Sequence, residues 1–213
     1  TMGQAPSKKE RSRKYISEHP YSSGEEKREE ENEEFEPMIE MASSLKEGGK
    51  ECLERGEFGH AMEQYGRSID ILDSLDKEDL VPEQRAQILK LLIPCLNDMA
   101  LVSTKMESWS QSIAFGRRCS SLCSPLLELP SSNPLIEALL GIQVSRATLV
   151  RWYQRALLSK VHGQLNLARF KRCIRGCNEW LSFWERYSVH CREELEIMRE
   201  NYRELLEAIE RDS

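Results

Sequence analysis

The segment Leu45–Ile69 reads LKEGGKECLERGEFGHAMEQYGRSI and decides the fold. In it, Gly56 follows Gly49 by seven residues. The large apolar Phe58 follows Gly49 by nine residues, and the small Ala61 follows it by twelve. Two antiparallel helices pack closely only where small residues face each other at the crossing, and a tight turn between them favours Gly. The segment therefore predicts a helical hairpin with its turn at Gly56.

Two later segments repeat these offsets of small, turn, large apolar and small residues. The second segment has Ala100, Glu107, Trp109 and Ser112 at the four offsets, and it lacks Gly at the turn. The third has Ala156, Gly163, Leu165 and Ala168. Three copies of one pattern predict three antiparallel helix pairs. The alternative is a generic helical bundle in which the spacing recurs by chance.

The rest of the chain is also helical in pattern. Apolar residues recur at spacings of three and four from Pro37 onward, and no stretch alternates over more than four residues, so the sequence predicts an all-α fold. We expect helix starts at Pro37, Pro82 and Pro134. Pro94 should kink the helix that begins at Pro82 or mark its true start. The expected breaks lie at Gly56, near 76–79, at 124–132 and at Gly163.

Composition divides the chain into a tail and a helical body. The chain has 213 residues, of which 39% are hydrophobic and 31% charged. Residues 1–34 contain almost nothing apolar and cannot bury enough surface to offset their ordering entropy. We therefore predict a disordered charged tail over 1–35. Alternatively, the acidic run Glu25–Glu34 begins a helix. Helical repeats should cover 36–180, and a C-terminal helix extension 181–213.

Charge and cysteine content narrow the compartment and the partners. The net charge is -6 and no groove-reading motif is present, so we expect no nucleic-acid partner. The sequence has no run of about 18 apolar residues, so we expect no membrane span. It has no apolar segment near its start, so we expect no secretory signal. Seven cysteines, an odd number, favour a reducing compartment, hence the cytoplasm.

The sequence offers no chemistry for catalysis or for metal binding. Gly-rich phosphate loops, HExxH and GxSxG motifs are all missing, so we expect neither an enzyme nor a cofactor. Cys119 and Cys123, like Cys173 and Cys177, are four residues apart and share a helix face. We interpret them as small apolar packing residues and expect no metal site.

The triple pattern resembles the tetratricopeptide repeat, a helix–turn–helix unit of 34 residues that stacks into a superhelix. Gly49 and Ala100 are 51 residues apart, and Ala100 and Ala156 are 56 apart, so helices or loops are lengthened. This extension, with a long charged final helix, is most similar to the repeat domains of immunophilin-type co-chaperones. The resemblance covers about Pro37 to Asp212. It implies a helical-repeat superhelix of about three extended pairs, with a concave groove for a partner, and no prolyl-isomerase activity.

In that family the groove often holds the acidic C-terminus of a heat-shock chaperone through Lys, Asn and Arg side chains. Matched by position, Lys46 fits the first repeat, and Lys50 replaces an Asn but keeps a donor. In the second repeat the matching residue is Asp98, which would repel a carboxylate, and Asn97 is its neighbour.

The third repeat leaves two alignments open. The strict offsets give Val150 and Gln154, whereas Arg151 and Arg155 each lie one residue further along. One residue is about 100° of helix rotation, so these arginines reach the groove only if the local turn is one residue longer. The resemblance thus implies a partial clamp, or alternatively solvated helix faces. The candidate groove residues are Lys46, Lys50, Asn97, Arg151 and Arg155.

The N-terminal segment carries a lipidation signal. Residues 2–7 read MGQAPS and fit the M-G-x-x-x-[ST] pattern for N-myristoylation, with Gly3 as the acceptor if Met2 is the true start. A single myristoyl chain binds membranes marginally. The basic residues that follow would add attraction to an anionic membrane, at about 1 kcal/mol each. They are Lys8, Lys9, Arg11, Arg13 and Lys14. The alternative is a coincidental match in a disordered tail.

These observations favour an adaptor that binds a protein or peptide partner in its groove and is tethered peripherally to the cytoplasmic face of a membrane. One alternative is a co-chaperone that binds an acidic chaperone C-terminus through the partial clamp. Another is a structural scaffold whose C-terminal helix, with Trp180, Phe183 and Trp184 at its start, packs on another protein or on itself.

Overall fold

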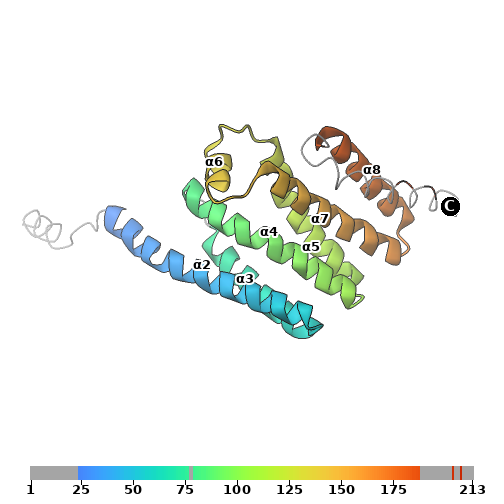
Figure 1. The fold of residues 1–213 in the computed structure, drawn as a ribbon, viewed down its shortest axis with the longest axis horizontal. Helices are drawn as coiled ribbons and strands as arrows, with labels where there is room; N and C mark the ends of the chain where they lie inside the picture. The colour runs from blue at the N-terminus through green and yellow to red at the C-terminus, as the bar shows by residue number, and fades with distance from the viewer. Residues whose placement is uncertain (1–23, 77–78, 188–202, 204–206, 208–213) are drawn as a thin grey trace, which may run out of the picture. The chain divides into compact units, whose positions relative to one another are not determined.

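The computed structural model describes residues 24–76, 79–187, 203 and 207, and these contain helices and no strands. The prediction of an all-α fold is confirmed. The helices are α2 (Gly24–Glu54), α3 (Phe58–Leu75), α4 (Pro82–Lys105), α5 (Trp109–Glu128), α6 (Pro134–Gly141), α7 (Arg146–Asn166) and α8 (Phe170–Tyr187) (Figure 1).

The chain divides into two compact units, residues 1–37 and 38–213, and α2 runs through the boundary between them. Pro37 was expected near a helix start, but it lies inside α2, which already begins at Gly24. The acidic run before Pro37 explains the early start, because Glu is a good helix former and favours the N-terminal end of a helix. Residues 24–35 are therefore helical, as the alternative reading of the tail anticipated.

The described part of unit 38–213 contains three helical hairpins, which pair α2 with α3, α4 with α5, and α7 with α8. The three turns share one geometry. Gly56, Glu107 and Ala168 have φ values of 76°, 57° and 52°, in the left-handed region. In each turn the next amide donates to a carbonyl five residues back: Glu57 to Cys52, Ser108 to Ser103, and Arg169 to Gln164, at 2.8–2.9 Å. Paired hydrogen bonds of this kind satisfy the last carbonyls of the preceding helix.

The third turn lies five residues later than the sequence pattern indicated. Gly163 was predicted to form it, but Gly163 is buried inside α7, and the turn is at Ala168. Counted from Ala168, the small positions become Val161 and Cys173, both fully buried. The prediction was wrong because Gly163 meets a different need. A Cβ at this position would lie 2.6 Å from Ile113 Cγ1, so Gly allows α7 to approach α5.

Close helix approach at small residues recurs between neighbouring helices. A Cβ on Gly49 would lie 2.9 Å from the Tyr65 ring, and one on Gly116 would lie 2.8 Å from the carbonyl oxygen of Ala156. These contacts join α2 to α3 and α5 to α7, so small side chains set the spacing both within a hairpin and between hairpins.

Helix α4 is the central core helix of this unit. It packs against α3, α5, α6 and α7, and its fully buried residues include Ile93, Leu96 and Val102. By length and composition alone it would also be able to cross a membrane, yet most of the qualifying stretch is buried inside the protein. We therefore interpret it as a core helix. It begins at Pro82, as predicted, and Pro94 lies inside it.

A further short helix separates the second and third hairpins. The helix that begins at Pro134 is short, because the chain turns between α6 and α7, where Gln143 has a φ of 67°. The predicted start at Pro134 is confirmed, and Asn133 caps it by accepting a hydrogen bond from Leu135 N at 3.0 Å. The preceding break begins later than expected, since α5 continues through Pro125 to Glu128.

The cysteines of the described part are buried thiols. Six are free and lie in every hairpin: Cys52, Cys95, Cys119, Cys123, Cys173 and Cys177. Burial raises the pKa of the Cys95 thiol to about 11, which keeps it protonated at neutral pH. The expectation that the two pairs spaced by four residues pack as small apolar side chains agrees with this burial.

Candidate functional site

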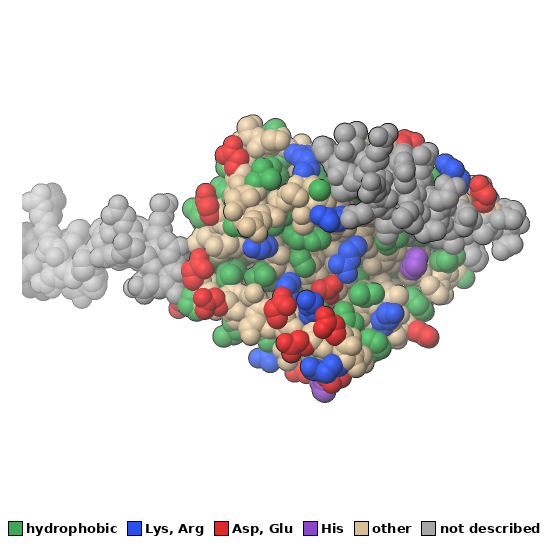
Figure 2. Space-filling model, viewed as in Figure 1, with side chains coloured by type: hydrophobic (Ala, Val, Ile, Leu, Met, Phe, Trp, Pro, Cys, Tyr) green, Lys and Arg blue, Asp and Glu red, His purple; other side chains and the backbone are tan. Residues whose placement is uncertain are grey.

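The first helices of the three hairpins, α2, α4 and α7, carry all five predicted groove residues. We call the surface that they form the α2–α4–α7 face. These helices lie nearer the viewer in Figure 1, with α3 and α5 behind them. In Figure 2, which shows the same side, cationic and anionic side chains are intermixed over this region. The face is therefore a charge mosaic, and its properties depend on how the charges pair.

The ion pair of Asp98 and Arg155 joins α4 to α7. Arg155 Nη2 lies 3.2 Å from Asp98 Oδ1, and the Asp98 side chain is 20% exposed whereas that of Arg155 is 50% exposed. Burial raises the pKa of Asp98, while the charges of Arg155 and Lys46 act in the opposite direction. The half-buried Asp98 carboxylate thus lies between cations from α2 and α7, and it forms its ion pair with Arg155.

Beneath Asp98 the face has a neutral polar floor. Tyr65 is fully buried, and its hydroxyl has no hydrogen-bond partner of normal length among the described residues. Burial and the neighbouring Asp98 carboxylate both raise the pKa of Tyr65. Ser68 Oγ donates to the carbonyl oxygen of Ala42 at 2.8 Å and lies 3.5 Å from Cys95 Sγ. Tyr65, Ser68 and Cys95 carry no charge at neutral pH, and the carboxylates that act on this floor are those of Asp98 and Glu47.

The two lysines of α2 lie on the same face as predicted, in different settings. Lys46 Nζ donates to Glu47 Oε1 at 2.5 Å, and the Lys46 side chain is largely covered. This hydrogen bond is the main reason that the pKa of Glu47 is lowered. Lys50 is exposed one turn further along. The exposed pair with Glu47 contributes little to stability, and a ligand carboxylate would compete with it for Lys46.

Asn97 was predicted as a groove residue and is not one. It is 2% exposed, and its Nδ2 donates to the carbonyl oxygen of Trp152 at 3.1 Å. Its Oδ1 is buried without a hydrogen-bond partner among the described residues. The rotation of about 100° per residue explains the difference, because it turns Asp98 outward and Asn97 toward α7.

Neither alignment considered for the third repeat matches the structure, because the turn is at Ala168, five residues after the strict position and four after the shifted one. Val150 and Gln154, the strict positions, are buried, whereas Arg151 and Arg155 are exposed. The offsets failed because they were counted from Ala156 and the turn lies five residues later. The arginines reach the surface through this longer helix, and Arg155 meets α4.

Several predicted residues lie outside the described part of the chain. The acceptor Gly3 and the basic patch of Lys8, Lys9, Arg11, Arg13 and Lys14 are among them, so lipidation and membrane attachment stay predictions. Most of the predicted C-terminal extension also lies outside. Of its expected anchors, Trp180 and Phe183 are buried within the described part, and the Phe183 ring packs against Tyr153 in a tilted arrangement, at 4.6 Å between ring centroids.

In the described ranges no group of three or more His, Cys, Asp or Glu side chains could hold a metal ion. No family model matches the sequence, and no solved structure matches the chain. The α2–α4–α7 face therefore has to be interpreted from its own residues. Sequence reasoning missed the central place of Asp98, which it treated as a departure from a pattern. The sequence did contain a signal for it: a charged residue, Asp98, stands in the otherwise apolar helix α4, two positions before the buried small residue Ala100.

Proposed function

We propose that this chain is a non-enzymatic interaction adaptor, related in design to tetratricopeptide-repeat proteins, which binds a protein or peptide partner on the α2–α4–α7 face. The observation that carries the proposal is the presence of three helical hairpins along the described chain, whose turns share one geometry that also occurs at Gln143 between α6 and α7. Stacked hairpins of this kind align their first helices into one extended surface. Such a surface suits an elongated partner better than a small molecule.

The charges on the face favour a partner segment with acidic groups. Lys46, Lys50, Arg151 and Arg155 come from two helices on either side of α4. The Asp98 carboxylate is acted on by cations of both α2 and α7 and forms an ion pair with Arg155, while Glu47 pairs with Lys46. An acidic segment would displace Asp98 from Arg155 and gain charge-assisted hydrogen bonds.

A photo-crosslinking experiment tests the location of the partner surface. A photoreactive amino acid placed at Lys50 or Arg151, on the α2–α4–α7 face, should capture the partner in cells. The same amino acid at the exposed Arg67 of α3 or Gln111 of α5 is the matched control. If the partner is captured from α3 or α5 and never from α2 or α7, the proposed face is refuted.

A co-chaperone is the second candidate, favoured by the position of Lys46 and Arg155 on opposite sides of Asp98. An acidic peptide with a free C-terminal carboxylate should bind wild-type protein weakly. Asp98→Asn should strengthen binding about tenfold, or about 1.4 kcal/mol, because it removes a repulsive charge and releases Arg155. Asp70→Asn, at an exposed position of α3, is the charge-matched control.

The opposite substitutions complete the test of this second candidate. Lys46→Ala and Arg155→Ala should each weaken binding of the acidic peptide, and Arg67→Ala should not. A titration in which Asp98→Asn does not strengthen binding and Arg155→Ala does not weaken it would exclude the co-chaperone. The adaptor proposal would still be judged by the crosslinking positions.

A further inference from the structure

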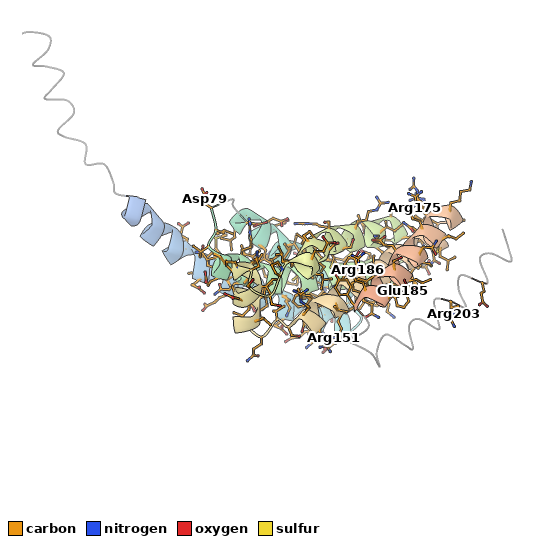
Figure 3. The ribbon with its side chains drawn as sticks, turned by 90° about the horizontal axis from the view of Figure 1, so that it is seen from above. Asp79, Arg151, Arg175, Glu185, Arg186 and Arg203 are labelled. Carbon is orange, nitrogen blue, oxygen red and sulfur yellow. The ribbon has the colours of Figure 1, made fainter. Side chains whose placement is uncertain are left out.

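A second polar site lies in unit 38–213, between α5, α7 and α8, in a pocket of 340 Å³. Its lining consists of Arg117 from α5, Lys160 and Gln164 from α7, and Arg172, Arg175, Gly176 and Glu179 from α8. Figure 3 places Arg175 and Arg151 on opposite sides of the molecule, so this pocket is separate from the α2–α4–α7 face. Its volume falls in the range of about 300–1,000 Å³ that is usual for small-molecule sites.

The pocket has an unbalanced charge. Four cations line it against the single carboxylate of Glu179. Arg117, Arg172 and Arg175 have no ion-pair partner among the described residues. Like charges gathered in one hollow raise its free energy and attract multiply charged anions. In addition, α8 has no acidic residue in its first turn, so its positive N-terminal end is not compensated locally.

Glu179 offsets the four cations of the pocket only in part, and its carboxylate is engaged by Lys160 and Tyr153. Its carboxylate lies 3.1 Å from Lys160 Nζ and accepts a hydrogen bond from Tyr153 Oη at 3.3 Å. The Lys160 side chain is only 12% exposed, whereas the Glu179 side chain is 42% exposed, so the ammonium group is covered and the carboxylate is open to solvent. The three arginines at the rim are left to bind an anion, and their planar forks match phosphate oxygens in bidentate geometry.

The amide of Gln164 adds a requirement of a different kind. Gln164 is 6% exposed, lines the pocket, and its Oε1 has no hydrogen-bond partner among the described residues. A buried acceptor without a donor costs about 1–3 kcal/mol. Gly176 faces this amide, and a Cβ there would lie 3.5 Å from Oε1 and only 2.9 Å from Val161 Cγ2, so Gly allows α8 to pack closely on α7 at this point. A ligand with a hydroxyl group would supply the missing donor.

From this combination we infer that the pocket binds a phosphorylated polyol, with phosphate groups on Arg117, Arg172 and Arg175 and a free hydroxyl on Gln164. The ligand is either free in solution or the headgroup of a lipid, because the recognising chemistry is the same. This site is independent of the partner surface proposed above.

Binding of inositol 1,4,5-trisphosphate to the full chain, measured by calorimetry, tests the inference. Arg172→Gln and Arg175→Gln should each lower the affinity about tenfold. Arg67→Gln, which removes the same charge from an exposed position of α3, should leave it unchanged. Glu179→Gln should raise the affinity, because it frees Lys160 and removes the one opposing charge. Circular dichroism on each variant confirms that the fold is retained.

Two further probes separate the hydroxyl from the phosphate requirement. Gln164→Met should weaken binding of inositol trisphosphate severalfold and leave that of inorganic pyrophosphate unchanged. Vesicles of phosphatidylcholine with phosphatidylinositol 4,5-bisphosphate should bind the chain if the ligand is a headgroup, and should not if it is free. The inference is overturned if wild-type protein binds none of these probes at millimolar concentration, or if Arg175→Gln and Arg67→Gln bind equally well.

Discussion

The substitution Ala168→Gly should change the free energy of unfolding in opposite directions depending on whether the third turn is at Ala168 or at Gly163. Ala168 has a φ of 52° and is exposed, so no packing is lost when its methyl group is removed. A non-Gly residue in the left-handed region costs about 1–2 kcal/mol, and Gly costs about 0.5–1 kcal/mol in extra chain entropy. Ala168→Gly should therefore stabilise the protein by about 0.5–1 kcal/mol.

The alternative placement predicts the reverse. If the turn were at Gly163, Ala168 would lie within the following helix, where replacement of Ala by Gly costs about 1 kcal/mol. Urea unfolding followed by circular dichroism measures the difference as a shift of the midpoint at constant slope. Ala114→Gly, at an exposed position inside α5, is the matched control and should destabilise by about 1 kcal/mol. If Ala168→Gly destabilises as much as Ala114→Gly, the argument for the turn is refuted.

Three other predictions concern packing, ionisation and lipidation. Gly116→Ala should destabilise the protein by about 1–3 kcal/mol, because the new Cβ would lie 2.8 Å from a backbone carbonyl oxygen of α7. In the same urea assay, Gly59→Ala should stabilise the protein by up to about 1 kcal/mol, because the space around Gly59 is open. Equal effects of the two substitutions would contradict the close approach of α5 and α7. Burial raises the pKa of Asp98 in the folded protein, so its ionisation should reduce stability as the pH rises from the ordinary pKa of 3.8 through the folded pKa. Arg155→Ala should raise the pKa of Asp98 further, as measured by NMR titration of its carboxyl group. An unchanged titration midpoint would show that the ion pair is not formed in solution. Intact-mass measurement of the natural protein should find a myristoyl group on Gly3, and an unmodified N-terminal peptide would exclude it.

Periodicity predicted most of the fold correctly because the hydrophobic pattern reflects core packing directly. The turn at Gly56 and the starts at Pro82 and Pro134 followed from local chemistry that these residues express by themselves. Gly163 misled because a Gly serves equally well in a turn and at a helix crossing, and the sequence does not distinguish the two uses. The residue type at Ala168 did not indicate a turn, because Ala has no preference for the left-handed conformation and the hairpin imposes it.

The candidate site was harder to predict than the fold. The sequence pattern placed the third turn five residues too early, and the positions counted from it, Val150 and Gln154, are buried whereas Arg155 is exposed. Asn97 and Asp98 are adjacent, and only the orientation of α4 against α7 determines which of them is buried. The pocket between α5, α7 and α8 was missed because its cations come from separate helices and form no local pattern.

The buried cysteines make the stability of each hairpin separately measurable. Cys52 belongs to the first hairpin, Cys95, Cys119 and Cys123 to the second, and Cys173 and Cys177 to the third. A thiol reagent can reach them only when the surrounding helices open, so its reaction rate at each position reports the opening free energy of that hairpin. Native protein labelled for increasing times and mapped by mass spectrometry would show in which order the hairpins open, without any introduced probe.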